Sequence, residues 1–376
     1  MQVSGLYAGI GGFELGFERA GHRTILLCEN DVHASRVLRS KLPNVLLHPN
    51  VETLPELPTE TEVVTAGFPC QNLSMAGDKT GIAGGKSSVI DRLFQLLDQR
   101  PVPWVVIENV YFMLHLRRGA AIAWILDRLE ERHYRWAYRV VDSRAFGLPQ
   151  RRRRVFIVAS PFQDPRNVLL ADDTPGQAWP VPVMTHPIGF YWTEGRSGNG
   201  LTGDAIPPLK AGSALGIPSP PAVLLPNGGR VVTPTIEAVE RLQGFPNGWT
   251  SSLRDGTERR FRWRLVGNAV SVPVAEWIGR RLSEPGVYDD SDDVPLVPGA
   301  SWPSAAWNMG DGGMSSKVSE CPLQRRRGRI SAFATEKWPD LSERALSGFV
   351  KRARDSKLRY PLGFLDALED KLRRRP

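Results

Sequence analysis

The chain opens with the stretch VSGLYAGIGGFELGFERA at positions 3–20, which joins a short apolar run, a turn rich in glycine and a helical pattern. The turn contains Gly9, Gly11 and Gly12, and glycines in such a turn let the backbone approach a ligand closely. A strand that runs through a glycine turn into a helix is typical of the first unit of an α/β domain. The stretch therefore predicts an open α/β domain with a ligand site at its first turn.

The same alternation of apolar runs and helical patterns continues to about residue 160. Strands are expected at 3–6, 24–28, 63–66, 104–107, 138–141 and 155–159, and helices at 12–20, 32–41, 88–99 and 119–131. Strands alternating with helices of this length favour a parallel sheet covered by helices. Glu29 follows the second strand, about 20 residues after the glycine turn, where a carboxylate can bind ribose hydroxyls. We therefore expect a nucleoside site.

Composition limits the classes of protein that remain. The chain has 376 residues, 41% of them hydrophobic, and a formal net charge of +8, so we expect more than one domain and a polyanionic partner such as nucleic acid. Its cysteines, Cys28, Cys70 and Cys321, form no C-x-x-C pair, so neither a disulfide framework nor a metal site is predicted. No apolar run approaches the roughly 18 residues of a membrane span, and we expect a soluble, cytoplasmic protein.

Changes in composition divide the rest of the chain. Residues 161–229 are rich in proline, glycine, serine and threonine and are expected to form loops and short strands. Helical periodicity returns within 230–282, at 235–243 and 271–282, which we expect to rejoin the first domain of residues 1–160. Residues 283–303 have the composition of a linker. Residues 304–376 are expected to form a basic helical extension, with helices near 341–353 and 361–372.

Three further blocks carry residues suited to catalysis. Cys70 lies in TAGFPCQNLS at 65–74, Glu108 and Asn109 end the apolar run WVVI at 104–107, and a basic block reads QRRRRVFI at 150–157. Taken singly, a cysteine after proline is usually a packing residue and an arginine run is usually a solvated face. Together with the glycine turn, and in this order, the four blocks resemble DNA cytosine-5 methyltransferases.

The resemblance implies a Rossmann-like domain that binds S-adenosylmethionine, with a small target-recognition domain at 161–229. The block GNAV at 267–270 is similar to the family motif that completes the cofactor pocket. The residues implied in cofactor binding are Tyr7, Ala8, Gly9, Gly11, Gly12, Glu29, Asn30, Asn50, Val51, Pro69, Asn268 and Ala269. The sequence departs from the family at Gly5 and at Asn50, where Asp is usual, and we expect these departures to affect the affinity for the cofactor rather than its identity.

The resemblance also implies a mechanism, because C5 of cytosine is too electron-deficient to attack a methyl donor by itself. Addition of the Cys70 thiolate at C6 makes C5 nucleophilic, and Glu108 would act as the acid at N3. Arg152 and Arg154 would give electrostatic support; as alternate residues at the start of a strand, they are expected to point to the same face. These four residues, Cys70, Glu108, Arg152 and Arg154, are the predicted catalytic set.

The implied partner is double-stranded DNA, from which the target base must be extruded before C5 and C6 are accessible. Residues 74–88, rich in glycine and lysine, are expected to form a lid over Cys70. Pro208-Leu209 stands where the family often has Thr-Leu. Candidate DNA contacts are Gln71, Ser74, Asn109, Arg196, Lys210 and Arg230.

Two other functions remain open on the sequence. The same chemistry could serve an RNA, in particular a tRNA, cytosine-5 methyltransferase. The departures at Gly5 and Asn50 would also suit a DNA-binding homologue with an impaired catalytic site. We expect a monomer, and a restriction endonuclease of the same system is the protein partner that the resemblance suggests.

Overall fold

The computed structural model describes residues 1–68, 90–194, 198–210, 220–253, 258–325, 328–334 and 337–373. The chain divides into two compact units, and neither is a continuous stretch. The first unit consists of Met1–Ala145, Arg153–Gly176 and Val270–Gln324, and the second of Phe146–Arg152, Gln177–Ala269 and Arg325–Pro376.

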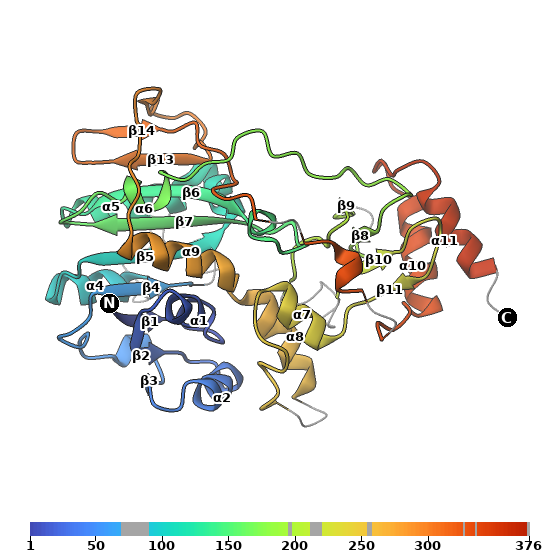
Figure 1. Ribbon diagram of the computed structural model, residues 1–376, viewed down its shortest axis with the longest axis horizontal. Helices are drawn as coiled ribbons and strands as arrows, with labels where there is room; N and C mark the ends of the chain where they lie inside the picture. The colour runs from blue at the N-terminus through green and yellow to red at the C-terminus, as the bar shows by residue number, and fades with distance from the viewer. Residues whose placement is uncertain are drawn as a thin grey trace, which may run out of the picture. The chain divides into compact units, whose positions relative to one another are not determined.

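The first unit is built on one large sheet, whose described strands have the order β12-β14-β13-β6-β7-β5-β4-β1-β2-β3 (Figure 1). Their bounds are β1 Gln2–Leu6, β2 Arg23–Cys28, β3 Leu46–His48, β4 Val63–Ala66, β5 Trp104–Val110, β6 Arg135–Asp142, β7 Arg153–Ser160, β12 Val294–Pro295, β13 Ala305–Asn308 and β14 Gly313–Ser315. Strands β1 to β5 pair in parallel, as the sequence predicts. The prediction of a parallel sheet is wrong for the remaining strands, because β7 lies antiparallel between β5 and β6.

Helices cover both faces of this sheet. Their bounds are α1 Gly12–Arg19, α2 Val32–Lys41, α4 Asp91–Gln99, α5 Ala120–Glu130, α6 Arg166–Leu169 and α9 Val272–Ser283, with short 3-10 turns that include η1 Val51–Thr53. Side chains of α4 and α5, such as Leu97 and Ile122, share one core with Leu6 and Ile107 of the strands. On the other face α1 packs against α9, and a Cβ at Gly16 would lie only 2.5 Å from the Ala275 Cβ. Glycine at position 16 therefore allows the two helices to approach closely.

The strands β12 to β14 lie in the part of the chain expected to be a linker and a helical extension. Ala306 of β13 pairs with Tyr138 of β6, so this segment extends the sheet instead of leaving it. The buried Arg139 fixes the arrangement, because its guanidinium donates to the carbonyl oxygens of Leu169 and Ser319 and to the Asp173 carboxylate. The expectation of a wholly helical extension from residue 304 is therefore wrong.

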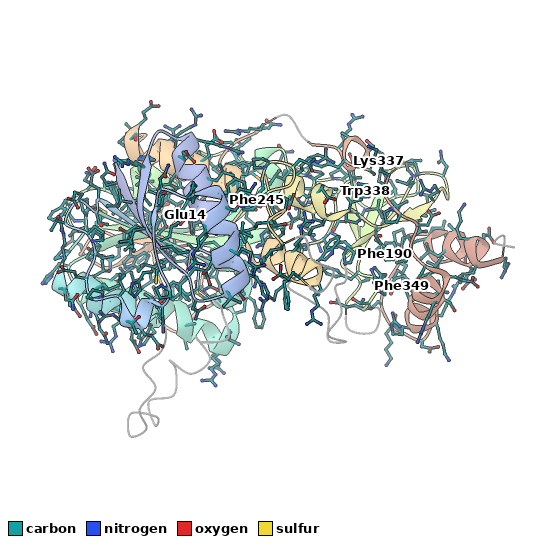
Figure 2. All side chains as sticks on the ribbon, turned by 90° about the horizontal axis from the view of Figure 1, so that it is seen from below. Glu14, Phe190, Phe245, Lys337, Trp338 and Phe349 are labelled. Carbon is teal, nitrogen blue, oxygen red and sulfur yellow. The ribbon has the colours of Figure 1, made fainter. Side chains whose placement is uncertain are left out.

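The second unit contains a small antiparallel sheet with the order β11-β10-β8-β9. Its elements are β8 Ile188–Phe190, β9 Thr202–Gly203, β10 Ala222–Leu224, β11 Val231–Val232, α7 Ile236–Leu242, α8 Arg259–Asn268, α10 Glu343–Arg354 and α11 Phe364–Arg373. The ring of Phe190 lies 4.8 Å from that of Phe349 on α10 and 5.3 Å from that of Phe364 on α11 (Figure 2). The C-terminal helices thus complete the core of this unit and are not an appendage.

In the part of the chain that the structure describes, no helix is both long and apolar enough to cross a membrane.

Candidate active site

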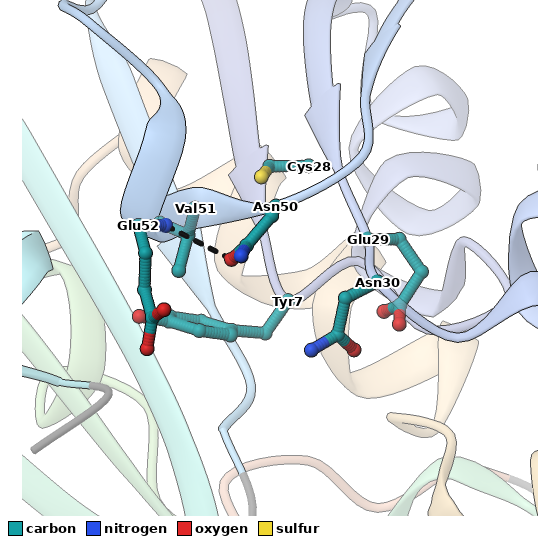
Figure 3. Close-up of a pocket in the computed structure, with 7 residues that line it drawn as sticks. All are labelled: Tyr7, Cys28, Glu29, Asn30, Asn50, Val51 and Glu52. Carbon is teal, nitrogen blue, oxygen red and sulfur yellow. Dashed lines mark hydrogen bonds between the residues drawn. The ribbon is translucent and has the colours of Figure 1, made fainter.

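A pocket lies in the first unit where β1, β2 and β3 end (Figure 3). It is lined by Tyr7, Cys28, Glu29, Asn30, Asn50, Val51 and Glu52. The sequence predicts Tyr7, Glu29, Asn30, Asn50 and Val51 as cofactor residues, and the structure brings these together. Cys28 and Glu52, which the sequence analysis did not assign to a site, also line the pocket. The position of Glu52 just after Asn50-Val51 was the available signal.

The Glu29 carboxylate is held in place by the backbone around it. Its Oε2 accepts a hydrogen bond of 2.7 Å from the Gly9 N–H, and its Oε1 accepts one of 2.8 Å from the Asp31 N–H. Burial raises the pKa of Glu29 above its usual value. Each carboxylate oxygen keeps a further lone pair, so Glu29 can accept hydrogen bonds from two vicinal hydroxyls, the arrangement that a ribose offers.

Tyr7 and Asn50 shape the pocket from the ends of β1 and β3. Tyr7 has a φ of 57°, a left-handed conformation that costs energy in a residue with a side chain, and its ring meets Phe68 edge-on at 6.2 Å. Burial raises the pKa of the Tyr7 phenol well above its usual value, which keeps the phenol protonated. The Asn50 Oδ1 accepts from the Glu52 N–H at 3.0 Å, the dashed line of Figure 3, and keeps a second lone pair for a ligand.

The glycine turn supports the pocket rather than lining it. The Ala8 N–H donates to the Cys28 carbonyl at 3.1 Å, and the Gly11 N–H donates back to the Ala8 carbonyl at 2.9 Å. Gly9 and Gly11 have left-handed φ angles, and Gly11 is the N-cap of α1. A Cβ at Gly12 would lie 2.6 Å from the Val270 carbonyl oxygen, so glycine there brings α1 against that backbone.

Asn268 and Ala269 belong to the second unit, where α8 ends at Asn268. Asn268 is exposed, whereas Ala269 is buried and its carbonyl accepts from Arg152 at 2.8 Å. The other described partners of Arg152 are the carbonyl oxygens of Leu209 and Gly267.

Arg152 and Arg154 therefore differ in their described partners. Arg152 is buried in the second unit and lies just before β7, which begins at Arg153. Arg154 belongs to the first unit, and its Nε lies 3.0 Å from the Glu108 Oε1. The antiparallel pairing of β5 with β7 brings these two side chains together, because Val110 of β5 is opposite Arg154. Arg154 is thus found beside the predicted acid.

Cys70 and Pro69 lie outside the described residues, as do Gln71, Ser74 and the lid predicted at 74–88. The backbone leading to Cys70 is described as far as Phe68. The buried Asn109 amide donates from Nδ2 to the Phe68 carbonyl at 3.1 Å, and a Cβ at Gly67 would lie 3.8 Å from the Glu108 Oε2. Glu108 and Asn109 thus flank the backbone two and three residues before Cys70.

Of the other residues expected at DNA, Arg196 lies outside the described residues. Lys210 forms an ion pair with Glu194, and its Nζ lies 3.8 Å from the centre of the Tyr191 ring. Arg230 contacts the Asp340 carboxylate at 2.9 Å and the Trp338 carbonyl at 3.0 Å. Both side chains remain partly exposed within the second unit. Asn109, in contrast, is only 2% exposed and donates to the Phe68 carbonyl.

Comparison with known proteins decides the family. Residues 1–185 match the model of the C-5 cytosine-specific DNA methylases. The type II methyltransferase M2.BsuMI of Bacillus subtilis (strain 168) is 44% identical over 98% of this chain and 97% of its own length. The chain belongs to the C-5 cytosine-specific DNA methylase family. The type II methyltransferase M.HaeII of Haemophilus aegyptius is a more distant relative, 27% identical over 72% of this chain and 88% of its own.

Solved structures share the fold of this C-5 methylase. The Dnmt2 methyltransferase of S. pombe superposes with a TM-score of 0.57 at 15% identity, covering 76% of this chain and 98% of its own. A prophage DNA modification methyltransferase from E. coli has a TM-score of 0.50 at 16% identity, covering 76% and 99%. These structures show a Rossmann-like methyltransferase fold. Membership of the C-5 DNA methylase family makes the protein dependent on S-adenosylmethionine, and the polar pocket around Glu29, Asn50 and Tyr7 fits the nucleoside of that cofactor.

Proposed function

We propose that this C-5 methylase modifies cytosine in double-stranded DNA through a covalent adduct of Cys70, with Glu108 and Arg154 acting on the same base. One observation carries the proposal: the Glu108 and Arg154 pair lies beside the backbone that leads to Cys70. Strands β1 and β4 are neighbours in the sheet and end side by side. Tyr7 of the pocket follows β1, and the backbone that leads to Cys70 follows β4.

The chemistry needs a nucleophile because the cytosine ring is electron-deficient at C5. Attack of the Cys70 thiolate on C6 places electron density on C5. Glu108, carrying a proton or sharing one with N3, offsets the charge that develops on the ring during this addition. After methyl transfer, loss of the C5 proton to a base and elimination of the thiolate give 5-methylcytosine and regenerate Cys70.

The protein's contribution to these steps is mainly the placement of charge. Arg154 faces the Glu108 carboxylate with its Nε 3.0 Å from Oε1, while one of its terminal nitrogens donates to the Arg153 carbonyl at 2.9 Å. Asn109 holds the Phe68 carbonyl and so positions the start of the Cys70 segment. Arg152, predicted as a catalytic residue, is better assigned to positioning, since it holds the backbone at 209, 267 and 269.

S-adenosylmethionine, when bound, supplies an electrophilic methyl group. We propose that Glu29 binds its ribose hydroxyls, that Asn50 and Val51 face its base, and that Tyr7 closes the pocket beside them. The pocket contains no arginine or lysine among its described lining residues, which suits a ligand without phosphate groups.

We propose that the second unit reads the target sequence. Its sheet β8 to β11 and the partly exposed Lys210 and Arg230 provide short loops and cationic side chains, which are the elements that contact phosphates and base edges. The relatives M2.BsuMI and M.HaeII are named as type II methyltransferases. We therefore further propose that the protein acts as a monomer in the cytoplasm, protecting DNA from a restriction endonuclease of the same system.

The direct test is mass spectrometry of nucleosides from duplex DNA incubated with S-adenosylmethionine and purified protein. We expect 5-methylcytosine with the wild type and with C321S, whose cysteine has no role in the proposal, and none with C70S. Methylation by C70S would refute the adduct. A tRNA acceptor in parallel separates the RNA alternative, because methylation of tRNA in preference to duplex DNA would overturn the proposed substrate.

A further inference from the structure

Glu14 is a buried carboxylate that the mechanism above does not use. It lies in the first turn of α1, two residues after the glycine turn ends, and 1% of it is exposed (Figure 2). Neither of its carboxylate oxygens has a hydrogen-bond partner among the described residues. An ionised carboxylate in this state is costly, so it must either carry a proton or be matched by a positive charge that a ligand brings.

The carboxylate occupies a specific place, the space over Gly5. A Cβ built on Gly5 would lie 2.1 Å from the Glu14 Oε1, closer than any two such atoms can come. Position 5 is where the sequence departs from the Asp that is usual in this family. The Glu14 side chain of α1 therefore occupies the space that a side chain at position 5 of β1 would fill. No residue larger than glycine fits at position 5 as long as Glu14 keeps this position.

The face of the sheet below Glu14 carries one further polar side chain. Gly5 pairs with Leu27 of β2 and with Thr65 of β4 in parallel register, so these residues point to the same face. The Thr65 hydroxyl is buried and has no hydrogen-bond partner among the described residues. The strand end that continues into Gly67 and Phe68 thus carries a second polar group on the face where Glu14 lies.

The charged groups around Glu14 do not neutralise it. Burial is the main cause that raises its pKa to about 7, and the charge of Glu29 adds to the effect. The other titratable or charged groups on the elements that pack here are Glu18 and Arg19 of α1, Arg23 and Cys28 of β2, and Glu276, Arg280 and Arg281 of α9. Arg23 is exposed, and Arg281 forms an ion pair with Asp172. Glu18 and Arg19 are exposed, Glu276 and Arg280 pair with each other at 2.9 Å, and burial raises the pKa of Cys28 to about 12.

We propose that Glu14 is the counter-charge of the cofactor site, which replaces the carboxylate absent at position 5 and gives up its proton when the cationic cofactor binds. The inference rests on the proposed function in taking S-adenosylmethionine as the ligand. Glu14 and Glu29 influence each other electrostatically, and Glu29 lines the pocket and holds the Gly9 N–H. A cofactor whose ribose is bound at Glu29 brings its sulfonium charge into the same region and favours ionisation of Glu14, and the released proton goes to the buffer.

Calorimetry of cofactor binding at pH 6, 7 and 8, in two buffers with different ionisation enthalpies, tests this proposal. The wild type is expected to release about half a proton near pH 7, and its affinity should rise about tenfold from pH 6 to pH 8. E14Q should lose the proton release. It should also lose the rise in affinity with pH, except for the part that comes from titration of the ligand's own amino group. E18Q, changed on the exposed side of the same helix, should behave as the wild type.

S-adenosylhomocysteine, whose sulfur is uncharged, should show a weaker dependence on pH than S-adenosylmethionine. If E14Q binds the cofactor with the same proton release and the same pH dependence as the wild type, the inference is overturned and the proposed function stays intact. Failure of the wild type to bind the cofactor at any pH would instead refute the proposed function as well. The proton count of the wild type needs no variant, so a poorly folded E14Q would not prevent the test: a wild type that binds without proton release overturns the inference.

Discussion

Glu108 and Arg154 form the pair on which the proposed chemistry depends, and their roles differ. Changing Glu108 to Gln keeps the size of the side chain but removes its acidity, so the methyl transfer rate in a single turnover is expected to fall by about 100-fold or more. R154K keeps the charge but loses the planar guanidinium, and a smaller fall is expected. The exposed pair of Arg128 and Glu131 offers the control, since R128K should leave the rate unchanged.

Cofactor binding should be retained in E108Q and R154K, because neither residue lines the pocket. An E108Q variant with the single-turnover rate of the wild type would remove Glu108 from the proposed mechanism.

The buried Glu14 has a consequence for stability as well as for binding. Its pKa is about 7 in the folded chain against a usual value of 4.5, so between these pH values the folded state holds a proton that the unfolded state has lost. The wild type therefore loses stability as pH rises through this window. E14Q lacks this penalty. The difference in the free energy of unfolding between E14Q and the wild type should therefore increase, in favour of E14Q, by about 3 kcal/mol from pH 4.5 to pH 8. Urea unfolding at several pH values measures it; a difference independent of pH would contradict the burial of an ionisable group.

At the scale of elements, α10 and α11 form the hydrophobic core of the second unit. Phe349 is fully buried against Phe190, and Arg352 donates to the carbonyls of Trp192 and Glu194. F349A should destabilise this unit by about 3–5 kcal/mol. The expected result is weaker DNA binding with cofactor binding retained, measured by urea unfolding, DNA titration and calorimetry.

Leu362, between the same helices, is 97% exposed and provides the matched control, since L362A should change none of these properties. Loss of cofactor binding in F349A, with DNA binding intact, would contradict the assignment of α10 and α11 to the second unit.

The elements that the sequence predicts well are those whose order is local. Helices such as α2 and α10 carry N-cap residues, Asp31 and Ser342, and an apolar stripe, so their periodicity is visible in the chain. Strands β8 to β11 have two or three residues each, too few for a periodic signal. Helix α8 escapes prediction because its apolar stripe is weak; Arg262, buried on it, is held by Glu240 at 3.1 Å, a contact distant in sequence.

The same distinction applies to the site. Tyr7, Glu29 and Asn50 follow directly after strands, and parallel strands end at a common edge, so the pocket could be predicted from motif order. Arg152 could not be placed this way, because alternation fixes a face only inside a strand and β7 begins one residue later. Glu14 and Gly5 form one spatial unit, yet their dependence on each other is visible only once α1 packs on β1.

At the scale of the whole molecule, both units are assembled from pieces far apart in the chain. The sequence predicts that residues 230–282 rejoin the first domain and sets 283–303 and 304–376 apart as a linker and an extension. In the structure, β13 pairs with β6 in the first unit, and α10 packs on β8 in the second. Such contacts depend on complementary edges and surfaces rather than on local pattern. The composition of 283–303 indicates a linker because proline and glycine end local structure, but a chain leaving one strand can still return to the same sheet.

This interleaving governs what a ribosome can fold. When only the residues up to about 300 have left the exit tunnel, the edge of β6 that will pair with β13 has no partner. Arg139 also lacks the Ser319 carbonyl that it will later contact. The second unit waits longer still, since Phe190 can meet Phe364 only after residue 364 has left the tunnel. A nascent chain therefore cannot complete either unit before residues beyond about 300 have emerged. The two units depend on the same late part of the chain.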